Sequence, residues 1–170
     1  MKDNFEKAFQ AMLREEGGFS NDPIDPGGIT NLGVTMASWE QYLGRQCSVD
    51  EMRALTPDVV RPHYRSVYWN KVRGDDLPSG VDLAVFDFGV NSGVSRSSKY
   101  LQRIVGVTDD GVVGNWTIAA VNKMDGNEII IDLCNARMAF LQGLSTFPHF
   151  GAGWTYRVNR IERLAKSMVA

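Results

Sequence analysis

The chain has few residues of the kinds that build metal or redox sites, with two cysteines and two histidines among its 170 residues. Cys47 and Cys134 are far apart and follow no metal-binding or redox spacing, so we expect free thiols, with Cys134 buried on a helix. His63 and His149 have no serine or carboxylate at catalytic spacing, and His63 is expected on a helix surface. The sequence therefore predicts no metal site and no cofactor.

Long apolar runs are also missing, and the first residues lack the charged start and apolar stretch of a signal peptide. We therefore expect synthesis in a cytoplasm. Neither a Gly-x-Ser-x-Gly motif nor a phosphate-binding or dinucleotide-binding loop is present. With 44% hydrophobic residues, a net charge of −2 and no repeat or flexible linker, the sequence predicts one compact, monomeric domain without a nucleic-acid partner.

A carboxylate at the end of the first predicted helix is the most informative feature that is present. Apolar residues recur with helical spacing from Phe5 to Leu13, and Glu16 continues this stripe directly before Gly17 and Gly18. Partial burial and the negative end of the helix dipole both favour the protonated form of Glu16. The two glycines leave no side chain that would block a ligand, so they are predicted to contact substrate.

A protonated carboxyl group beside an ionised one is the pair that glycoside hydrolysis requires, because the leaving oxygen must be protonated as the bond breaks. Asp25 is the candidate for the ionised partner, since it lies in a loop rich in proline and glycine. Thr30 follows in a short extended segment, where its hydroxyl group can hold a water or a sugar hydroxyl. Simpler interpretations stay open: Glu16 as an ordinary helix-end residue, and Asp22 and Asp25 as turn formers.

Helix signals dominate the rest of the chain. Thr35, Ser48 and Thr56 are predicted N-caps, and Val59 is expected on the core side of the third of these helices. Further helices are predicted at 80–90, 95–105, 115–121, 126–144 and 151–168.

The predicted helix at 80–90 is apolar almost all round, which is typical of a buried central helix. Asp87, together with Asn91 four residues later, places two polar side chains on one face of it. The pair is either a satisfied internal network or part of a substrate-binding cleft wall. Four aromatic residues are candidates for stacking on sugar rings, although such residues more often belong to a core: Phe19, Tyr42, Trp69 and Trp116.

The segment from Glu16 to Val34, with its Glu-Gly-Gly-Phe and Asp-Pro-Gly-Gly-Ile-Thr-Asn-Leu-Gly-Val motifs, resembles the signature of glycoside hydrolase family 108. These are lysozyme-like N-acetylmuramidases of bacteriophages and bacteria. The resemblance continues through residues 86–93, and residues 110–117 and 153–160 are similar to the predicted peptidoglycan-binding region of that family. The order of Glu, Asp and Thr also resembles phage-type lysozymes, which bears on Asp25 and Thr30.

The resemblance implies a mainly α, lysozyme-like fold, a helical body with a small β element next to the first helix. Residues 1–93 would form a catalytic lobe and residues 94–170 a helical lobe resembling a peptidoglycan-binding region. It implies an endolysin that hydrolyses the β-1,4 bond between N-acetylmuramic acid and N-acetylglucosamine, with Glu16 as the catalytic acid. A lytic transglycosylase and a non-catalytic peptidoglycan-binding or secretion-accessory protein are the alternatives. Peptidoglycan in the periplasm or cell wall is the expected partner, reached with the help of a separate holin.

Overall fold

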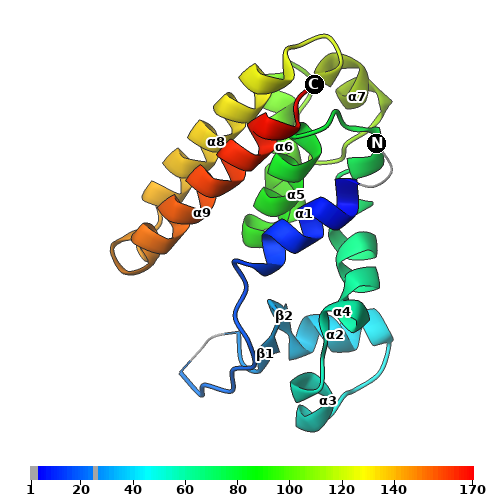
Figure 1. Cartoon of the computed structure of the whole chain (residues 1–170), viewed down its shortest axis with the longest axis vertical. Helices are drawn as coiled ribbons and strands as arrows, with labels where there is room; N and C mark the ends of the chain where they lie inside the picture. Colours follow the sequence, from blue (N-terminus) through cyan, green and yellow to red (C-terminus); the bar gives the residue numbers. More distant parts are fainter. Residues whose placement is uncertain (1–3, 25–26) are drawn as a thin grey trace. The chain divides into compact units, whose positions relative to one another are not determined.

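The computed structural model describes residues 4–24 and 27–170, which are mainly helical with a small two-stranded antiparallel sheet (Figure 1). The predicted mainly α, lysozyme-like class is therefore confirmed. None of the helices in these residues combines the length and the apolar composition needed to cross a membrane. The elements are α1 (Asn4–Leu13), β1 (Thr30–Asn31), β2 (Val34–Thr35), α2 (Met36–Leu43), α3 (Val49–Arg53), α4 (Pro57–Tyr64), the π-helix η1 (Arg65–Trp69), the 3-10 helix η2 (Gly74–Asp76), α5 (Val81–Ser92), α6 (Val94–Ile104), α7 (Asn115–Val121), α8 (Gly126–Gln142) and α9 (Phe147–Met168).

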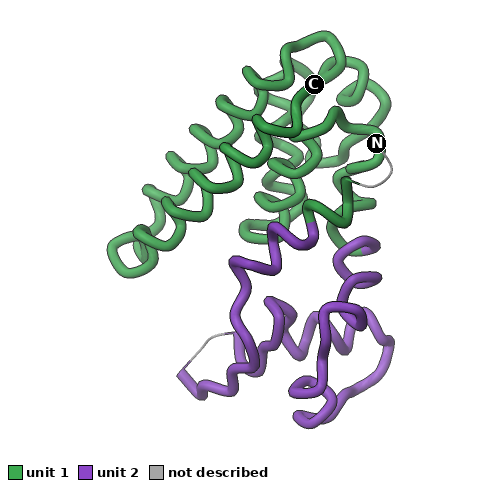
Figure 2. Tube along the Cα trace, in the orientation of Figure 1, with its two compact units in different colours: residues 1–8, 67–170 green, residues 9–66 purple. Residues whose placement is uncertain are grey.

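The chain forms two compact units (Figure 2). Unit 1 contains residues 1–8 and 67–170, and unit 2 contains residues 9–66. These units are delimited by packing, and the expected division into a catalytic lobe (1–93) and a peptidoglycan-binding lobe (94–170) stays a prediction. Residues 67–93 belong to unit 1 because α5 packs against α6, α8 and α9.

Unit 1 is built around α5, whose residues from Val81 to Gly89 are all buried. The long helices α8 and α9 lie side by side in Figure 1 and both pack against α5. A helix that is apolar on every side has no face suited to water, so it is stable only when neighbouring helices surround it. The sequence prediction of a central buried helix is confirmed.

Unit 2 begins with the second half of α1 and continues through the sheet to α4. Three side chains cap its helices as predicted: Thr35 accepts a hydrogen bond from the Ser38 backbone, and Ser48 and Thr56 cap α3 and α4 in the same way. These caps satisfy backbone N–H groups that have no partner within the helix. They also set where the short helices of this unit begin.

Some local predictions were wrong. Val59 is 48% exposed rather than buried, because the core side of α4 is formed by Val60, His63 and Tyr64. The last helix starts at Phe147, four residues before the predicted start, with Pro148 in its first turn. Proline is well tolerated there because the N–H group it lacks would have no partner in the first turn.

Candidate active site

Glu16 lies in the turn that follows α1 in unit 2. The helix ends at Leu13, and the chain continues through a tight turn in which the Glu16 N–H donates to the Leu13 carbonyl oxygen at 3.2 Å. The Glu16 residue is half-buried, whereas Gly17 and Gly18 are exposed. The carboxyl group is thus attached to a short, hydrogen-bonded piece of backbone directly after a helix whose apolar face is packed.

The carboxyl group of Glu16 lies against the turn of the β-hairpin. Asn31 pairs with Val34, so Leu32 and Gly33 form a two-residue loop, and both have positive φ angles, 52° and 76°. Positive φ at both loop positions is the mark of a type I′ turn. A Cβ atom at position 33 would lie only 2.7 Å from Glu16 Oε2, so only glycine leaves room for this carboxyl group.

Tyr64, near the C-terminal end of unit 2, stabilises the same turn. Its hydroxyl group donates a 2.8 Å hydrogen bond to the Leu32 carbonyl oxygen, and the same hypothetical Cβ at Gly33 would lie 2.7 Å from that hydroxyl. The Leu32 N–H donates to the Gly17 carbonyl oxygen at 3.1 Å. Leucine seldom adopts a positive φ, so these two bonds hold a conformation that the residue itself disfavours.

Further contacts fix the hairpin to the helices of unit 2. Asn31 is almost fully buried and donates from Nδ2 to the Met52 carbonyl oxygen at 2.8 Å, which ties β1 to α3. Tyr64 packs against Phe9 of α1 with the ring centroids 5.7 Å apart. The turn beside Glu16 is therefore supported by α1, α3 and α4, which is the kind of rigid surroundings that a catalytic carboxyl group needs.

Gly17 and Gly18 border open space. A Cβ atom at either position would meet no atom within 4 Å, and neither residue has a positive φ angle. Neither packing nor backbone strain therefore accounts for glycine here. An open backbone next to Glu16 suits the approach of a bulky ligand, and the contact of these glycines with substrate stays a prediction.

The loop that follows is closed by a pair of backbone hydrogen bonds between Ser20 and Thr30, at 2.8 and 2.9 Å. Within it, Asp22 Oδ1 accepts from the Ile24 N–H at 2.9 Å, so Asp22 acts as a turn former. Asp25 lies outside the described residues, and its role as the second carboxylate stays a prediction. The Thr30 hydroxyl group makes no hydrogen bond to the residues that the structure describes, which leaves it available to a ligand.

Asp87 and Asn91, the polar pair on α5, lie in different environments. Asp87 is fully buried, and its carboxylate accepts bonds from Arg137 Nη1 at 2.8 Å and from Arg157 Nη2 at 2.9 Å and Nε at 3.1 Å. Burial alone would raise the pKa of Asp87, but the charges of the two guanidinium groups hold that pKa below its usual value. This geometry favours the internal network over the cleft wall. Asn91 is half-buried and accepts a hydrogen bond from the Ser92 hydroxyl at 3.0 Å.

Four side chains that the sequence analysis named lie in different environments. His63 is buried rather than on the surface, 3.3 Å from Ser38 Oγ and surrounded by aromatic rings, and this burial lowers its pKa to about 4. Trp69 is fully buried and donates from Nε1 to Asp75 at 2.9 Å, so it cannot stack on a sugar. Trp116 is 86% exposed at the start of α7 and remains available. Cys134 is buried as predicted, and burial raises the pKa of its thiol to about 12.

We did not predict Leu32, Gly33 and Tyr64 as parts of the site. A signal for Gly33 was present, because a Leu-Gly pair between two extended residues fits a two-residue hairpin loop. Tyr64 is buried on the core face of α4, and a buried tyrosine needs a partner for its hydroxyl group. Its partner was not predictable, since Leu32 lies 32 residues away in sequence.

Comparisons with known proteins indicate the family of the chain. Residues 9–93 match the family described as glycosyl hydrolase 108, and residues 96–159 match a predicted peptidoglycan domain. A solved structure described as that of Brucella abortus SagA is 49% identical, covers 99% of this chain and 97% of its own, and superimposes with a TM-score of 0.91. No protein with a curated description matches the sequence. The family match spans the whole of the site around Glu16, and the chain therefore belongs to the glycosyl hydrolase 108 family.

Proposed function

We propose that the chain is an N-acetylmuramidase that hydrolyses the β-1,4 bond between N-acetylmuramic acid and N-acetylglucosamine. Membership of the glycosyl hydrolase 108 family and the match to a peptidoglycan domain support a glycoside hydrolase that acts on peptidoglycan. The observation that carries the finer proposal is the position of the Glu16 carboxyl group, which is held against the Leu32-Gly33 turn beside the open backbone of Gly17 and Gly18.

In this proposal Glu16 is the general acid and donates its proton to the glycosidic oxygen as the bond to the sugar breaks. Asp25 stabilises the positive charge that develops on the sugar ring or activates the attacking water. Thr30 assists with its hydroxyl group, which is at the base of the same loop. Tyr64 acts through the turn: by holding the Leu32 carbonyl oxygen it keeps Gly33, and hence the carboxyl group, in place.

The proposal includes action on the wall in the periplasm, with passage across the membrane provided by a separate partner such as a holin. It also includes a phage endolysin as the biological setting. Similarity to a protein from Brucella abortus fits a bacterial setting equally well. The catalytic step is the same in both.

The test compares Glu16→Gln with Glu15→Gln on purified sacculi, with product masses and thermal melts recorded in parallel. Glutamine keeps the shape of the side chain but cannot donate the proton, so we expect turnover to fall by about a hundredfold or more. The neighbouring variant should keep its activity, because Glu15 lies off the apolar stripe that Glu16 continues.

Three outcomes would overturn the proposal or part of it. Full activity of Glu16→Gln, or equal losses in both variants, would remove Glu16 as the acid. Products with 1,6-anhydro ends in place of free reducing N-acetylmuramic acid would identify a lytic transglycosylase. Intact sacculi with bound protein would identify a non-catalytic binding protein.

A further inference from the structure

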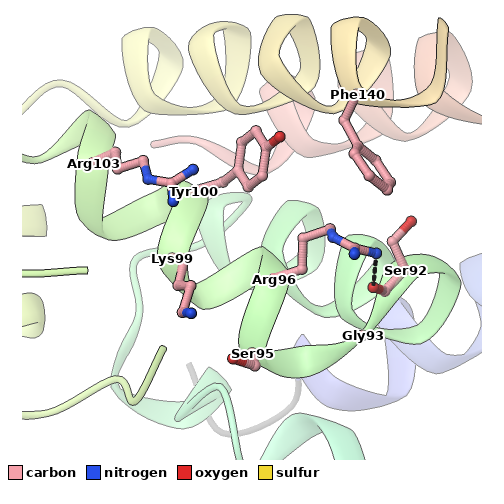
Figure 3. Close-up of a pocket in the computed structure, with 8 residues that line it drawn as sticks. All are labelled: Ser92, Gly93, Ser95, Arg96, Lys99, Tyr100, Arg103 and Phe140. Carbon is pink, nitrogen blue, oxygen red and sulfur yellow. Dashed lines mark hydrogen bonds between the residues drawn. The ribbon is translucent and has the colours of Figure 1, made fainter. Parts of the chain in front are cut away.

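A cationic pocket of about 510 Å³ lies on unit 1, along one side of α6 (Figure 3). Arg96, Lys99 and Arg103 line it from α6, and no acidic residue is among its lining residues. Their spacing of three and four residues places all three on one face of the helix, spread over about 10 Å. The pocket has the size of a typical small-ligand site.

Two aromatic rings form the other wall. Tyr100 of α6 and Phe140 of α8 are in contact, with their ring centroids 6.3 Å apart. The Arg96 guanidinium lies 4.3 Å from the centroid of Phe140, and that of Arg103 lies 5.4 Å from the centroid of Tyr100. Figure 3 shows Tyr100 projecting from α6 toward α8, and Phe140 projecting from α8 toward α6.

This arrangement positions the cations and leaves most of their N–H donors available. Arg96 uses Nη1 for the Ser92 carbonyl oxygen at 3.0 Å, and Arg103 uses Nε for Asp109 Oδ2 at 2.6 Å. The Lys99 ammonium makes no hydrogen bond or ion pair with the residues that the structure describes. Guanidinium groups held on aromatic faces lose less conformational entropy when they bind an anion.

We propose that this pocket binds the free carboxylates of the stem peptides that peptidoglycan carries. The inference rests on peptidoglycan being the polymer on which the chain acts, as proposed above. An extended peptide rises about 3.3 Å per residue, so carboxylates two or three residues apart match the spread of the three cations. Aromatic walls suit the short apolar side chains and backbone between those carboxylates. All five residues that form the cations and the aromatic wall lie within the region that matches the peptidoglycan domain.

Stem peptides fit the pocket better than sugars do. Uncharged N-acetylglucosamine units have no group that three cations would recognise, whereas carboxylates form short, charge-assisted hydrogen bonds with arginine. The pocket would hold a peptide branch of the polymer and so increase the time that the enzyme stays on its substrate. Binding of this kind is expected to weaken as the salt concentration rises.

The test measures binding by isothermal titration to the full chain. The ligand is a soluble muropeptide, a disaccharide that carries its stem peptide, and the variant is R96Q/K99Q/R103Q. We expect the triple variant to bind the muropeptide at least about tenfold more weakly than the unchanged protein, because several charge-assisted hydrogen bonds are lost together. The matched control is K71Q/K123Q/R163Q, which removes the same charge from exposed positions of unit 1 that have no ion pair with the described residues.

Two further probes identify the ligand group. The same muropeptide with its carboxyl groups amidated should bind weakly to the unchanged protein, and an uncharged oligosaccharide of N-acetylglucosamine should bind the unchanged protein and the triple variant equally. Equal affinity losses in the triple variant and the control would overturn the proposal. Tighter binding of inorganic polyphosphate than of muropeptide would also overturn it, in favour of a phosphate-rich polymer.

Failure of this inference can be told apart from failure of the proposed function. Muropeptide binding is measured without turnover, so the binding result remains valid even if the protein does not cleave sacculi. Loss of muropeptide affinity in R96Q/K99Q/R103Q tests the pocket, whereas loss of sacculus cleavage in Glu16→Gln tests the proposed function.

Discussion

Tyr64 and Leu32 are joined by a 2.8 Å hydrogen bond from the tyrosine hydroxyl to the leucine carbonyl oxygen. The bond connects the end of α4 to a hairpin turn in which leucine has a φ angle of 52°. The next residue, Gly33, carries the contact with the Glu16 carboxyl group. A single hydroxyl group thus helps to hold the backbone against which the proposed general acid rests.

Replacement of Tyr64 by phenylalanine removes this bond and leaves the packing of the ring intact. We expect unfolding to become easier by about 1–2 kcal/mol, the usual effect of leaving a partly buried carbonyl without its partner. Activity on sacculi, measured well below the melting temperature, should fall by about tenfold or more because the turn is less well held. Tyr42→Phe is the control, since the Tyr42 hydroxyl makes no hydrogen bond to the described residues. Unchanged kcat in Tyr64→Phe would show that the bond serves stability alone.

Gly33→Ala tests the contact between the turn and the carboxyl group. The new Cβ would lie 2.7 Å from both Glu16 Oε2 and the Tyr64 hydroxyl, so the carboxyl group must move. A shift of this kind should lower kcat by about a hundredfold. Gly44→Ala has a similar positive φ, 70° against 76°, but nothing within 4 Å of the new Cβ. Gly44→Ala should therefore lose about 1 kcal/mol of unfolding free energy through the backbone alone and keep a normal kcat. Similar kcat losses in both would contradict the proposed geometry.

Asp87→Asn tests the buried network of unit 1. Removal of the carboxylate charge takes the Asp87 counter-charge away from the buried Arg137 and Arg157, and we expect a loss of about 3–5 kcal/mol in unfolding free energy. Asp132→Asn, on the exposed side of α8, should leave the unfolding free energy unchanged. Denaturant titration gives both values. A stable Asp87→Asn protein with weakened peptidoglycan binding would instead return Asp87 to the ligand-binding residues.

His63 should make the stability of the protein fall in mild acid. Burial lowers its pKa in the folded state from 6.5 to about 4, so the unfolded state takes up a proton first as the pH falls. The stabilising contribution is complete above pH 6.5 and is lost as the pH falls toward 4, with a total of about 3 kcal/mol. His63→Gln should flatten the dependence of unfolding free energy on pH in this window. His149→Gln, at an exposed position, should not. Parallel pH profiles for all three proteins would contradict the assignment.

Local chemistry made the helix boundaries of unit 2 predictable. Thr35, Ser48 and Thr56 cap their helices with their own side chains, and Gly44 ends α2 with a positive φ. Such signals act between residues a few positions apart, so a sequence pattern contains all of the interacting groups. Glu16 was singled out as the candidate general acid for the same reason, because it and its two glycines follow the apolar stripe of α1 directly, and this role stays a prediction.

The surroundings of individual side chains were decided by contacts between distant residues. Asp87 became part of an internal network because Arg137 and Arg157, 50 and 70 residues away, reach its carboxylate. Arg157 had no sequence signal for burial, since its charge fits a solvated helix face equally well. His63 is buried because aromatic residues of two helices surround it, which the order of residues along α4 does not reveal.

By itself, the sequence determined the mainly helical fold, the caps, the buried character of α5 and the identity of the candidate acid, since each depends on neighbours within a few residues or on composition. Tertiary structure alone decided that Leu32 adopts a positive φ, that Gly33 lies against Glu16 and that Tyr64 holds the turn. These features depend on groups from α1, the hairpin and α4 meeting at one point. Such a meeting is set by the packing of the elements, and no local spacing encodes it.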